Sequence, residues 1–263
     1  MPVLVLIFAA CAPPSEVAPA SPAATTAPDV DAEWSLEDLV AAVLDMTALP
    51  ILSPHEVRDT YLALMAAGDA VCPGSTTQLT GTDLRGCTAE TGYFYAGIGT
   101  WFEQTGSPPS WRLGGDFEII DAEGHRFIGG GLVGWGQSGE GVETSEYQGQ
   151  WSYPGGTDAW LGTGISAYLA EVVTPAGVLT LDGGLTYGAV SVWAEALSYD
   201  PATCEGLTGG LQVRDPSGLW FTLSFGDDCD NIAVLGLDGE DLGALELDLT
   251  AWMEALLDHA GEG

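Results

Sequence analysis

The amino-acid sequence predicts a mainly β fold: an antiparallel meander, sandwich or barrel-like, with an N-terminal helical pair and a short C-terminal helix. Three observations support this prediction. Apolar residues alternate with a period of two from about residue 70 to 249, short turns rich in Gly and Asp separate the alternating runs, and helical spacing occurs only before and after this region. No repeat of roughly 20–50 residues is present, which disfavours a solenoid or a propeller.

Residues 1–10 form a short apolar run that ends at Cys11. The run is much shorter than the roughly 20 apolar residues that cross a bilayer as a helix, and it has the length of a signal-peptide core. The stretch Phe8-Ala9-Ala10-Cys11 resembles the lipobox of bacterial lipoproteins. This resemblance implies that the peptide is cleaved before Cys11, that the Cys11 thiol carries diacylglycerol, and that the mature chain is anchored in a membrane. An ordinary secretory signal, with Cys11 incidental, is the alternative.

Residues 11–33 form a segment rich in Pro, Ala, Ser and Thr, with few large apolar side chains. Such a segment cannot bury enough apolar surface to offset the entropy of ordering it. We therefore expect a disordered linker, which a Pro-rich chain extends by about 3.1 Å per residue. Ala12 stands where some bacterial lipoproteins carry the Asp that retains them at the inner membrane. The resemblance therefore implies the outer membrane or the cell surface as the location.

Residues 34–69 predict two helices. In the first, apolar residues recur at helical spacing within "SLEDLVAAVLDM". In the second, Ser53 is the expected N-cap, Pro54 occupies the first helical position and Gly68 ends the helix. The segment "TAWMEALLDHA" predicts the short C-terminal helix.

Residues 70–263 contain the β-rich domain, and its strands are separated by turn signals. Gly and Asp tolerate the backbone conformations that tight turns need, so they mark the expected ends of hairpins. We expect turns at residues 122–124, 182–184, 215–218 and 238–239. Two overlapping matches to G-x-G-x-x-G, at residues 129–134 and 134–139, lie in a β-patterned stretch. They disfavour a dinucleotide site, because that motif must open a helix.

Four cysteines remain once Cys11 is assigned to the anchor. An even number of cysteines in an exported chain predicts two disulfides, and four cysteines allow three pairings. We expect the pairs Cys72–Cys87 and Cys204–Cys229, because each brackets one polar, glycine-rich excursion. A zinc site is disfavoured because the chain has no C-x-x-C motif and no His near these cysteines.

The chain is strongly acidic, with 38 acidic residues against five basic ones and a net charge of −33. A charge of this size repels DNA, RNA and anionic lipid head groups, which excludes nucleic acid as a partner. It permits cations and basic proteins. Adaptation of the host organism to salt would explain the same charge without any functional role.

The sequence singles out no catalytic residue. Its three His are scattered, it has no G-x-S-x-G motif, and its many carboxylates give no preferred pair. No cofactor is expected except calcium, for which Asp227, Asp228 and Asp230 offer clustered hard-oxygen ligands; a solvated acidic loop is the alternative. Aromatic side chains in the polar, glycine-rich region around residues 134–160 are candidates for stacking on a glycan, unless the region forms two further strands. These candidates are Trp135, Trp151, Tyr153 and Trp160.

These observations together predict a lipid-tethered, highly acidic exported protein. We expect a binding or structural lipoprotein of the cell envelope, with a surface protein or a glycan as its unidentified partner and without catalytic activity. The first alternative is a secreted carbohydrate-active hydrolase, which needs two carboxylates roughly 5–10 Å apart in a cleft flanked by exposed tryptophans. The second is a calcium-dependent adhesion or carbohydrate-binding module.

Overall fold

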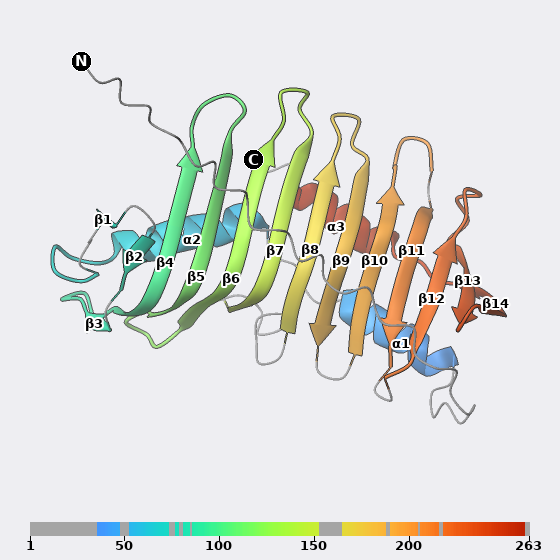
Figure 1. Ribbon diagram of the computed structural model, residues 1–263, viewed down its shortest axis with the longest axis horizontal. Helices are drawn as coiled ribbons and strands as arrows, with labels where there is room; N and C mark the ends of the chain where they lie inside the picture. Colours follow the sequence, from blue (N-terminus) through green and yellow to red (C-terminus); the bar gives the residue numbers. More distant parts are fainter. Residues whose placement is uncertain are drawn as a thin grey trace, which may run out of the picture.

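The computed structural model describes residues 36–47, 53–73, 77–78, 81–84, 86–152, 165–187, 190–204, 206–215 and 218–260. These residues form one sheet and three helices (Figure 1). The strands are β1 (Thr77–Gln78), β2 (Gly81–Asp83), β3 (Cys87–Thr88), β4 (Phe94–Gln104), β5 (Ser110–Ile120), β6 (Arg126–Gln137), β7 (Glu143–Ser152), β8 (Ile165–Val173), β9 (Leu179–Tyr187), β10 (Val190–Tyr199), β11 (Leu207–Arg214), β12 (Trp220–Phe225), β13 (Ile232–Leu237) and β14 (Glu240–Glu246). The helices are α1 (Leu36–Thr47), α2 (Pro54–Ala66) and α3 (Thr250–Ala260).

The sheet is an antiparallel meander in which strands that follow each other in the chain lie side by side. The hydrogen-bonded order is β1-β2-β4-β5-β6-β7-β8-β9-β10-β11-β12-β13-β14, and β3 pairs with β4 off this path. The predicted mainly β meander, the helical pair before it and the short helix after it are therefore confirmed. The expected sandwich or barrel-like arrangement is not what the described strands form: they make one sheet in which β1 and β14 lie at opposite ends and do not pair. Helices, and not a second sheet, cover its apolar side.

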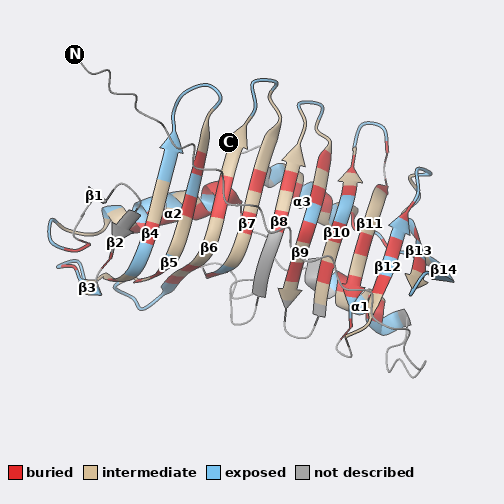
Figure 2. Cartoon of the chain, viewed as in Figure 1, coloured by how far each residue is buried: buried red, intermediate tan, exposed pale blue. Residues whose placement is uncertain are grey.

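All three helices lie on the same side of the sheet (Figure 1). Since side chains alternate along a strand, the long strands that the helices cover have one row of residues on the helix side and one row on the opposite side. We call these two sides the covered face and the open face. In β5 the side chains of Trp111, Leu113, Phe117 and Ile119 are buried on the covered face, whereas Arg112 and Asp116 are on the open face. Figure 2 shows this alternation as bands along the strands.

The core lies between the helices and the covered face. Leu39 and Val43 of α1, Val57 and Tyr61 of α2, and Met253 of α3 are all at most 2% exposed. The Tyr95 hydroxyl of β4 donates a hydrogen bond to the carbonyl oxygen of Leu64 in α2, at 2.6 Å. The helices therefore supply the second layer that the apolar face of the sheet needs.

Helix α2 begins as the sequence predicts. The Ser53 side chain accepts a hydrogen bond from the backbone N–H of His55 at 3.2 Å, and Pro54 occupies the first turn. Beyond the helix, the Cys72–Cys87 disulfide joins the following loop to β3. The second disulfide joins Cys204 to Cys229. Both predicted pairings are therefore confirmed.

One predicted turn is wrong. Residues 182–184 do not reverse the chain, because they lie inside β9. The Asp182 carboxylate accepts a hydrogen bond from the backbone N–H of Ala196 at 2.8 Å, at the point where β10 carries a bulge. Gly183 has a φ of +104°, which glycine adopts without strain. The Asp-Gly-Gly sequence thus accommodates a bulge in the neighbouring strand.

The other expected turns fall between strands. Residues 122–124 separate β5 from β6, and residues 238–239 separate β13 from β14. Of the turn expected at residues 215–218, the structure describes Asp215 and Gly218, and the N–H of Gly218 donates to the carbonyl oxygen of Asp215 at 3.0 Å. The glycine motif at residues 129–134 lies wholly within β6, so it does not open a helix as the dinucleotide-binding motif does.

None of the described helices is long and apolar enough to cross a membrane. The predicted signal peptide, Cys11 and the linker over residues 11–33 lie outside the described residues, so their assignment remains a prediction from the sequence.

Candidate functional site

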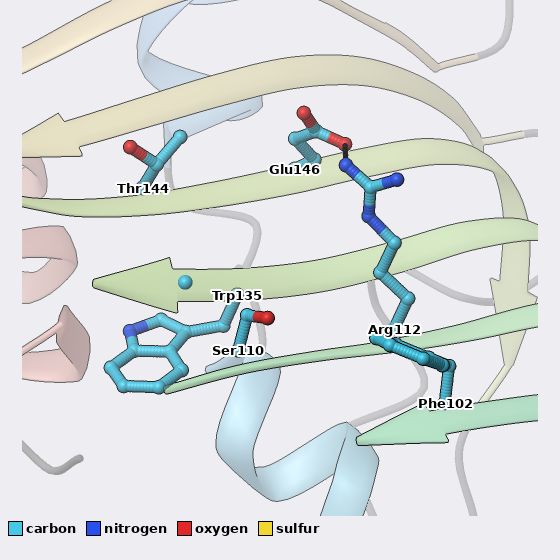
Figure 3. A pocket seen from close by; sticks show the side chains of 7 residues that line it. Phe102, Ser110, Arg112, Trp135, Thr144 and Glu146 are labelled. Carbon is cyan, nitrogen blue, oxygen red and sulfur yellow. Dashed lines mark ion pairs between the residues drawn. The ribbon is translucent and has the colours of Figure 1, made fainter. Parts of the chain in front are cut away.

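The open face carries a pocket of about 430 Å³ over strands β4–β7 (Figure 3). It lies where β4 and β6 end and where β5 and β7 begin. Its lining residues are Phe102, Ser110, Arg112, Trp135, Gly136, Thr144 and Glu146.

The pairing of the strands explains why the sheet is hollow here. One row across the four strands contains Phe102, Arg112, Gly134 and Glu146, each paired with the next. The neighbouring row pairs Ser110 with Gly136 and Gly136 with Thr144. Strand β6 contributes only glycine to both rows, so the side chains of β5 and β7 stand on either side of a gap.

Arg112 and Glu146 face each other across this gap. The Arg112 guanidinium lies 3.9 Å from the Glu146 carboxylate, and the two side chains are 62% and 39% exposed. A Cβ added to Gly134 would lie 3.2 Å from Cγ of Arg112, which shows that the Arg112 stem crosses this glycine. An exposed ion pair of this kind contributes little to stability, so its charged groups are available to a ligand.

The remaining lining supplies an apolar ring and two hydroxyl groups. Phe102 is 56% exposed, which is high for so large an apolar side chain. Ser110 and Thr144 each carry a hydroxyl that can donate and accept hydrogen bonds. The pocket therefore combines an aromatic surface with a positively charged hydrogen-bond donor, a negatively charged acceptor and two neutral hydroxyl groups.

The covered face holds a second group of polar residues, but helix α2 closes it off. His55, Ser145 and Glu171 are each at most 5% exposed. The His55 ring makes edge contacts with the rings of Trp111 and Trp135, at centroid distances of 6.0 and 5.0 Å. This group lies in the core and does not form a site that solvent can enter.

Burial perturbs the ionisable groups of this buried cluster. Desolvation raises the pKa of Glu171 to about 8, because the charged carboxylate has lost its contact with water. Desolvation also raises the pKa of Tyr147 well above 10.0, and the nearby carboxylates of Glu171 and Glu56 raise it further. Glu171 therefore carries a proton near neutral pH.

The predicted aromatic ligand-binding residues are only partly in place. Trp135 is among the residues that line the pocket, but it pairs with Trp111 in the row of the covered face. Its ring contacts His55, and its indole N–H donates to Glu143 at 3.4 Å. Trp151 is 3% exposed and packs against Phe117 and Phe127, so its prediction as an exposed ring is wrong. The physical reason is register: Trp151 pairs with Gly129 on the covered face. Tyr153 and Trp160 lie outside the described residues.

The predicted calcium ligands do not converge. Among the described residues, the carboxylates of Asp227, Asp228 and Asp230 do not form a group with metal-binding distances. Asp230 instead accepts a hydrogen bond from the backbone N–H of Ile232 at 3.1 Å. Calcium binding by these three residues therefore stays a prediction from the sequence, without support from a converging group of ligand atoms in the described part of the chain.

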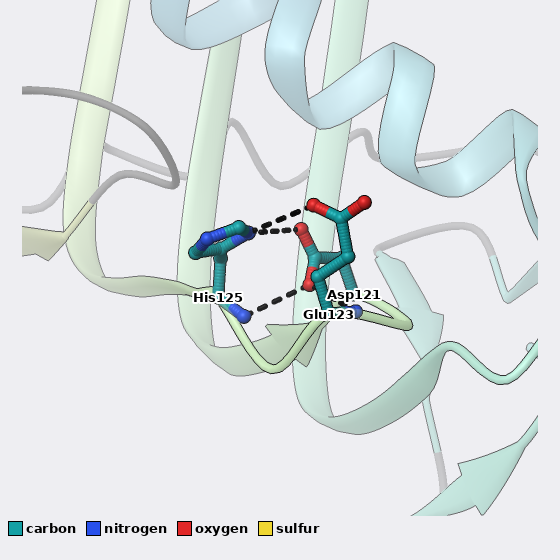
Figure 4. A group of neighbouring side chains, drawn as sticks. All are labelled: Asp121, Glu123 and His125. Atoms are coloured by element: carbon teal, nitrogen blue, oxygen red, sulfur yellow. Dashed lines mark hydrogen bonds and ion pairs between the residues drawn. The ribbon is translucent and has the colours of Figure 1, made fainter.

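A different group does converge, at the turn between β5 and β6. The ligand atoms of Asp121, Glu123 and His125 lie within 4.8 Å of one another (Figure 4). Nδ1 of His125 lies 2.8 Å from Oδ2 of Asp121. The hydrogen bond with Asp121 raises the pKa of the His125 imidazole above its usual value.

Most residues of the pocket were not identified from the sequence. Phe102, Ser110, Arg112, Thr144 and Glu146 come from three strands, and their proximity depends on strand register. One signal was present: Gly134 and Gly136 stand two residues apart in a β-patterned stretch. Such spacing places both glycines on one face, where they leave a gap.

No family model, curated protein or solved structure matches this chain. Only its own fold, charge and pocket bear on its function.

Proposed function

We propose that the protein is a non-catalytic binding protein of the cell envelope, tethered through Cys11, which holds a neutral glycan in the pocket on its open face. The observation that supports this proposal is the pocket itself, which places an exposed aromatic ring beside hydroxyl and charged groups. Sugar rings offer apolar C–H faces and many hydroxyls. The face of Phe102 suits the former, and Arg112, Glu146, Ser110 and Thr144 suit the latter.

Electrostatics favour an uncharged ligand. Arg112 and Glu146 compensate each other within the pocket, and the whole chain carries a net charge of −33. An anionic ligand would be repelled by the long-range field and would have to compete with Glu146 for Arg112. A neutral, hydroxyl-rich ligand meets neither obstacle.

The lining of the pocket supports binding over hydrolysis. Glu146 is the one carboxylate among the described lining residues, and its partner is Arg112. A glycosidase would need a second carboxylate at hydrolytic distance in the same cleft. The large rings of Trp111 and Trp151 are buried on the opposite face, at 2% and 3% exposure, and do not flank the pocket.

A binding screen tests this proposal. The mature protein is applied to an array of neutral oligosaccharides, and each hit is measured by isothermal titration calorimetry. Phe102→Ala should weaken binding about tenfold, which corresponds to about 1.4 kcal/mol of lost contact. Arg112→Gln should also weaken it, because the substitution removes a charged donor at the pocket wall.

Phe94→Ala provides the matched control. Phe94 lies on the same strand and the same face as Phe102 but does not line the pocket. Binding should be unchanged in this variant. An array without hits, or an equal loss of affinity in the Phe94 and Phe102 variants, would overturn the assignment of the pocket.

The tether is tested by the intact mass of the protein from a membrane fraction. A mature chain that begins at Cys11 and carries acyl chains supports the anchor, and Cys11→Ser should release the protein into the soluble fraction. A mass that corresponds to cleavage elsewhere without lipid would remove the anchor and leave an exported soluble binding protein.

A further inference from the structure

The turn between β5 and β6 carries the group of Asp121, Glu123 and His125, which lies far from the pocket. Ser110 and Arg112 stand at the start of β5, and Asp121 directly follows its last residue, Ile120. The group and the pocket therefore occupy opposite ends of the same strands. A role for this group does not depend on the function proposed for the pocket.

We propose that Asp121, Glu123 and His125 form a binding site for a divalent transition-metal ion of the zinc type. The site would take one imidazole nitrogen and two carboxylate oxygens from the protein and a water molecule from the solvent.

The distances between the ligand atoms suit such an ion. Zinc binds nitrogen and oxygen at about 2.0–2.2 Å in a tetrahedron, so neighbouring ligand atoms stand roughly 3.4 Å apart. Nδ1 of His125 is 2.8 Å from Oδ2 of Asp121 and 3.6 Å from Oε2 of Glu123. All three ligand atoms lie within 4.8 Å of one another, and Figure 4 shows their side chains converging.

The backbone holds one of the ligands in position. Oδ1 of Asp121 accepts hydrogen bonds from the backbone N–H groups of Glu123 and His125, both at 2.8 Å. The carboxylate is thereby fixed through one oxygen, and its other oxygen is directed at the imidazole. A ligand oriented by such secondary contacts loses less freedom when it binds a metal.

The ligand types select the class of ion. Calcium and magnesium take oxygen ligands, whereas an imidazole nitrogen suits zinc, copper and nickel. The side chains of His125 and Glu123 are 53% and 81% exposed, so solvent can supply the remaining ligand. The net charge of −33 raises the local concentration of any cation.

The test is a titration of the full-length metal-free protein with Zn²⁺ at about pH 8, because Asp121 raises the pKa of His125 and a proton on the ring competes with the metal. Calorimetry should show one tight site per chain. His125→Ala should weaken this site at least tenfold, and Asp121→Asn should weaken it as well. In the NMR spectrum, Zn²⁺ should shift the ring resonances of His125, and a tenfold excess of Ca²⁺ should leave them in place.

The turn between β13 and β14 supplies the matched control. It also brings carboxylates together, Asp238 in the turn and Glu240 at the start of β14, but no histidine. Asp238→Asn should leave zinc affinity unchanged. The proposal is overturned if His125→Ala binds zinc as tightly as the wild type, or if binding is equally weak and of high stoichiometry in all variants, as for ions attracted to an acidic surface.

Discussion

The two faces of strands β4–β7 both contain rows of glycine, and the rows differ in what surrounds them. On the covered face, Gly99, Gly115, Gly131 and Gly149 pair with one another across all four strands. A Cβ at Gly115 would lie 2.0 Å from the carbonyl oxygen of Ile98, and one at Gly131 would lie 2.0 Å from that of Gln148. On the open face, a Cβ at Gly134 or Gly136 would come no closer than 3.2 Å to a side-chain atom.

This difference separates structural glycines from glycines that shape a site. The covered row allows close approach between neighbouring backbones and leaves room for α2, since a Cβ at Gly99 would lie 2.6 Å from the Tyr61 hydroxyl. The open-face glycines are not needed for backbone contact. Their effect is to leave the hollow that Arg112 and Glu146 border.

The largest expected effect is the difference in stability between two Gly→Ala substitutions at adjacent residues, one on each face of β5. Gly115→Ala should destabilise the protein by about 3 kcal/mol, because Gly115 has a φ of +141° and its new Cβ would clash with backbone. Gly114→Ala, one residue earlier, places its Cβ 3.4 Å from its nearest neighbours and should change stability by less than about 1 kcal/mol. Urea denaturation measures both. Equal losses would show that the two faces do not differ in this way.

The second expected effect is the pH dependence of stability that a carboxyl group causes when it is buried on the covered face. Glu171 is buried on the covered face with a pKa of about 8, compared with 4.5 for the unfolded chain. At a pH between these two pKa values, Glu171 is protonated in the folded state and ionised in the unfolded state. The free energy of unfolding therefore falls as pH rises, by up to about 1.4 kcal/mol per pH unit. Below the unfolded pKa this group adds no pH dependence.

Glu171→Gln should remove this contribution. The variant should gain stability relative to the wild type as pH rises from about 5 to 8, while the repulsion among the many other carboxylates stays common to both chains. Gln150→Glu, which places a carboxylate at an exposed position in β7, should differ little from the wild type at either pH. Denaturation curves of the wild type and both variants at the two pH values measure these differences in stability. Parallel pH profiles for Glu171→Gln and the wild type would mean that the buried carboxyl is solvated.

The sequence predicted the meander and its flanking helices because both depend on local patterns. The alternation of apolar and polar residues predicts a strand from neighbouring residues alone. Ser53 and Pro54 likewise predict the start of a helix without information from distant residues. The disulfides were predictable for the same reason, since each joins cysteines close together in the chain, 15 and 25 residues apart.

The pocket depends on register, which no local pattern specifies. Arg112 and Glu146 belong to different strands, and they meet only because both oppose Gly134. A shift of one residue in either pairing would have exchanged the two faces. The same principle explains the failure at Trp151, whose exposure was inferred from polar neighbours and not from its face. The Asp-Gly-Gly sequence at residues 182–184 is typical of a turn, but in this structure it lies opposite a bulge in β10.

The smallest expected effect tests whether the open face contributes to stability at all. Arg126 and Glu118 form an ion pair between β6 and β5 on this face, with side chains 60% and 27% exposed. Pairs so accessible to water contribute roughly 0.2–1 kcal/mol, and salt weakens them further. A double-mutant cycle with Arg126→Gln and Glu118→Gln should therefore give a coupling energy below about 1 kcal/mol in low salt.

In about 1 M salt, where the screening length is about 3 Å, the coupling should approach zero. Such a result would fit a sheet whose stability comes from the helix-covered side, so that the other side is free to vary its charges for binding. A coupling above about 2 kcal/mol that persists in salt would contradict this division, because exposed pairs do not reach that value. It would mean that ion pairs on the open face stabilise the fold, and the Arg112–Glu146 pair would then be expected to do the same.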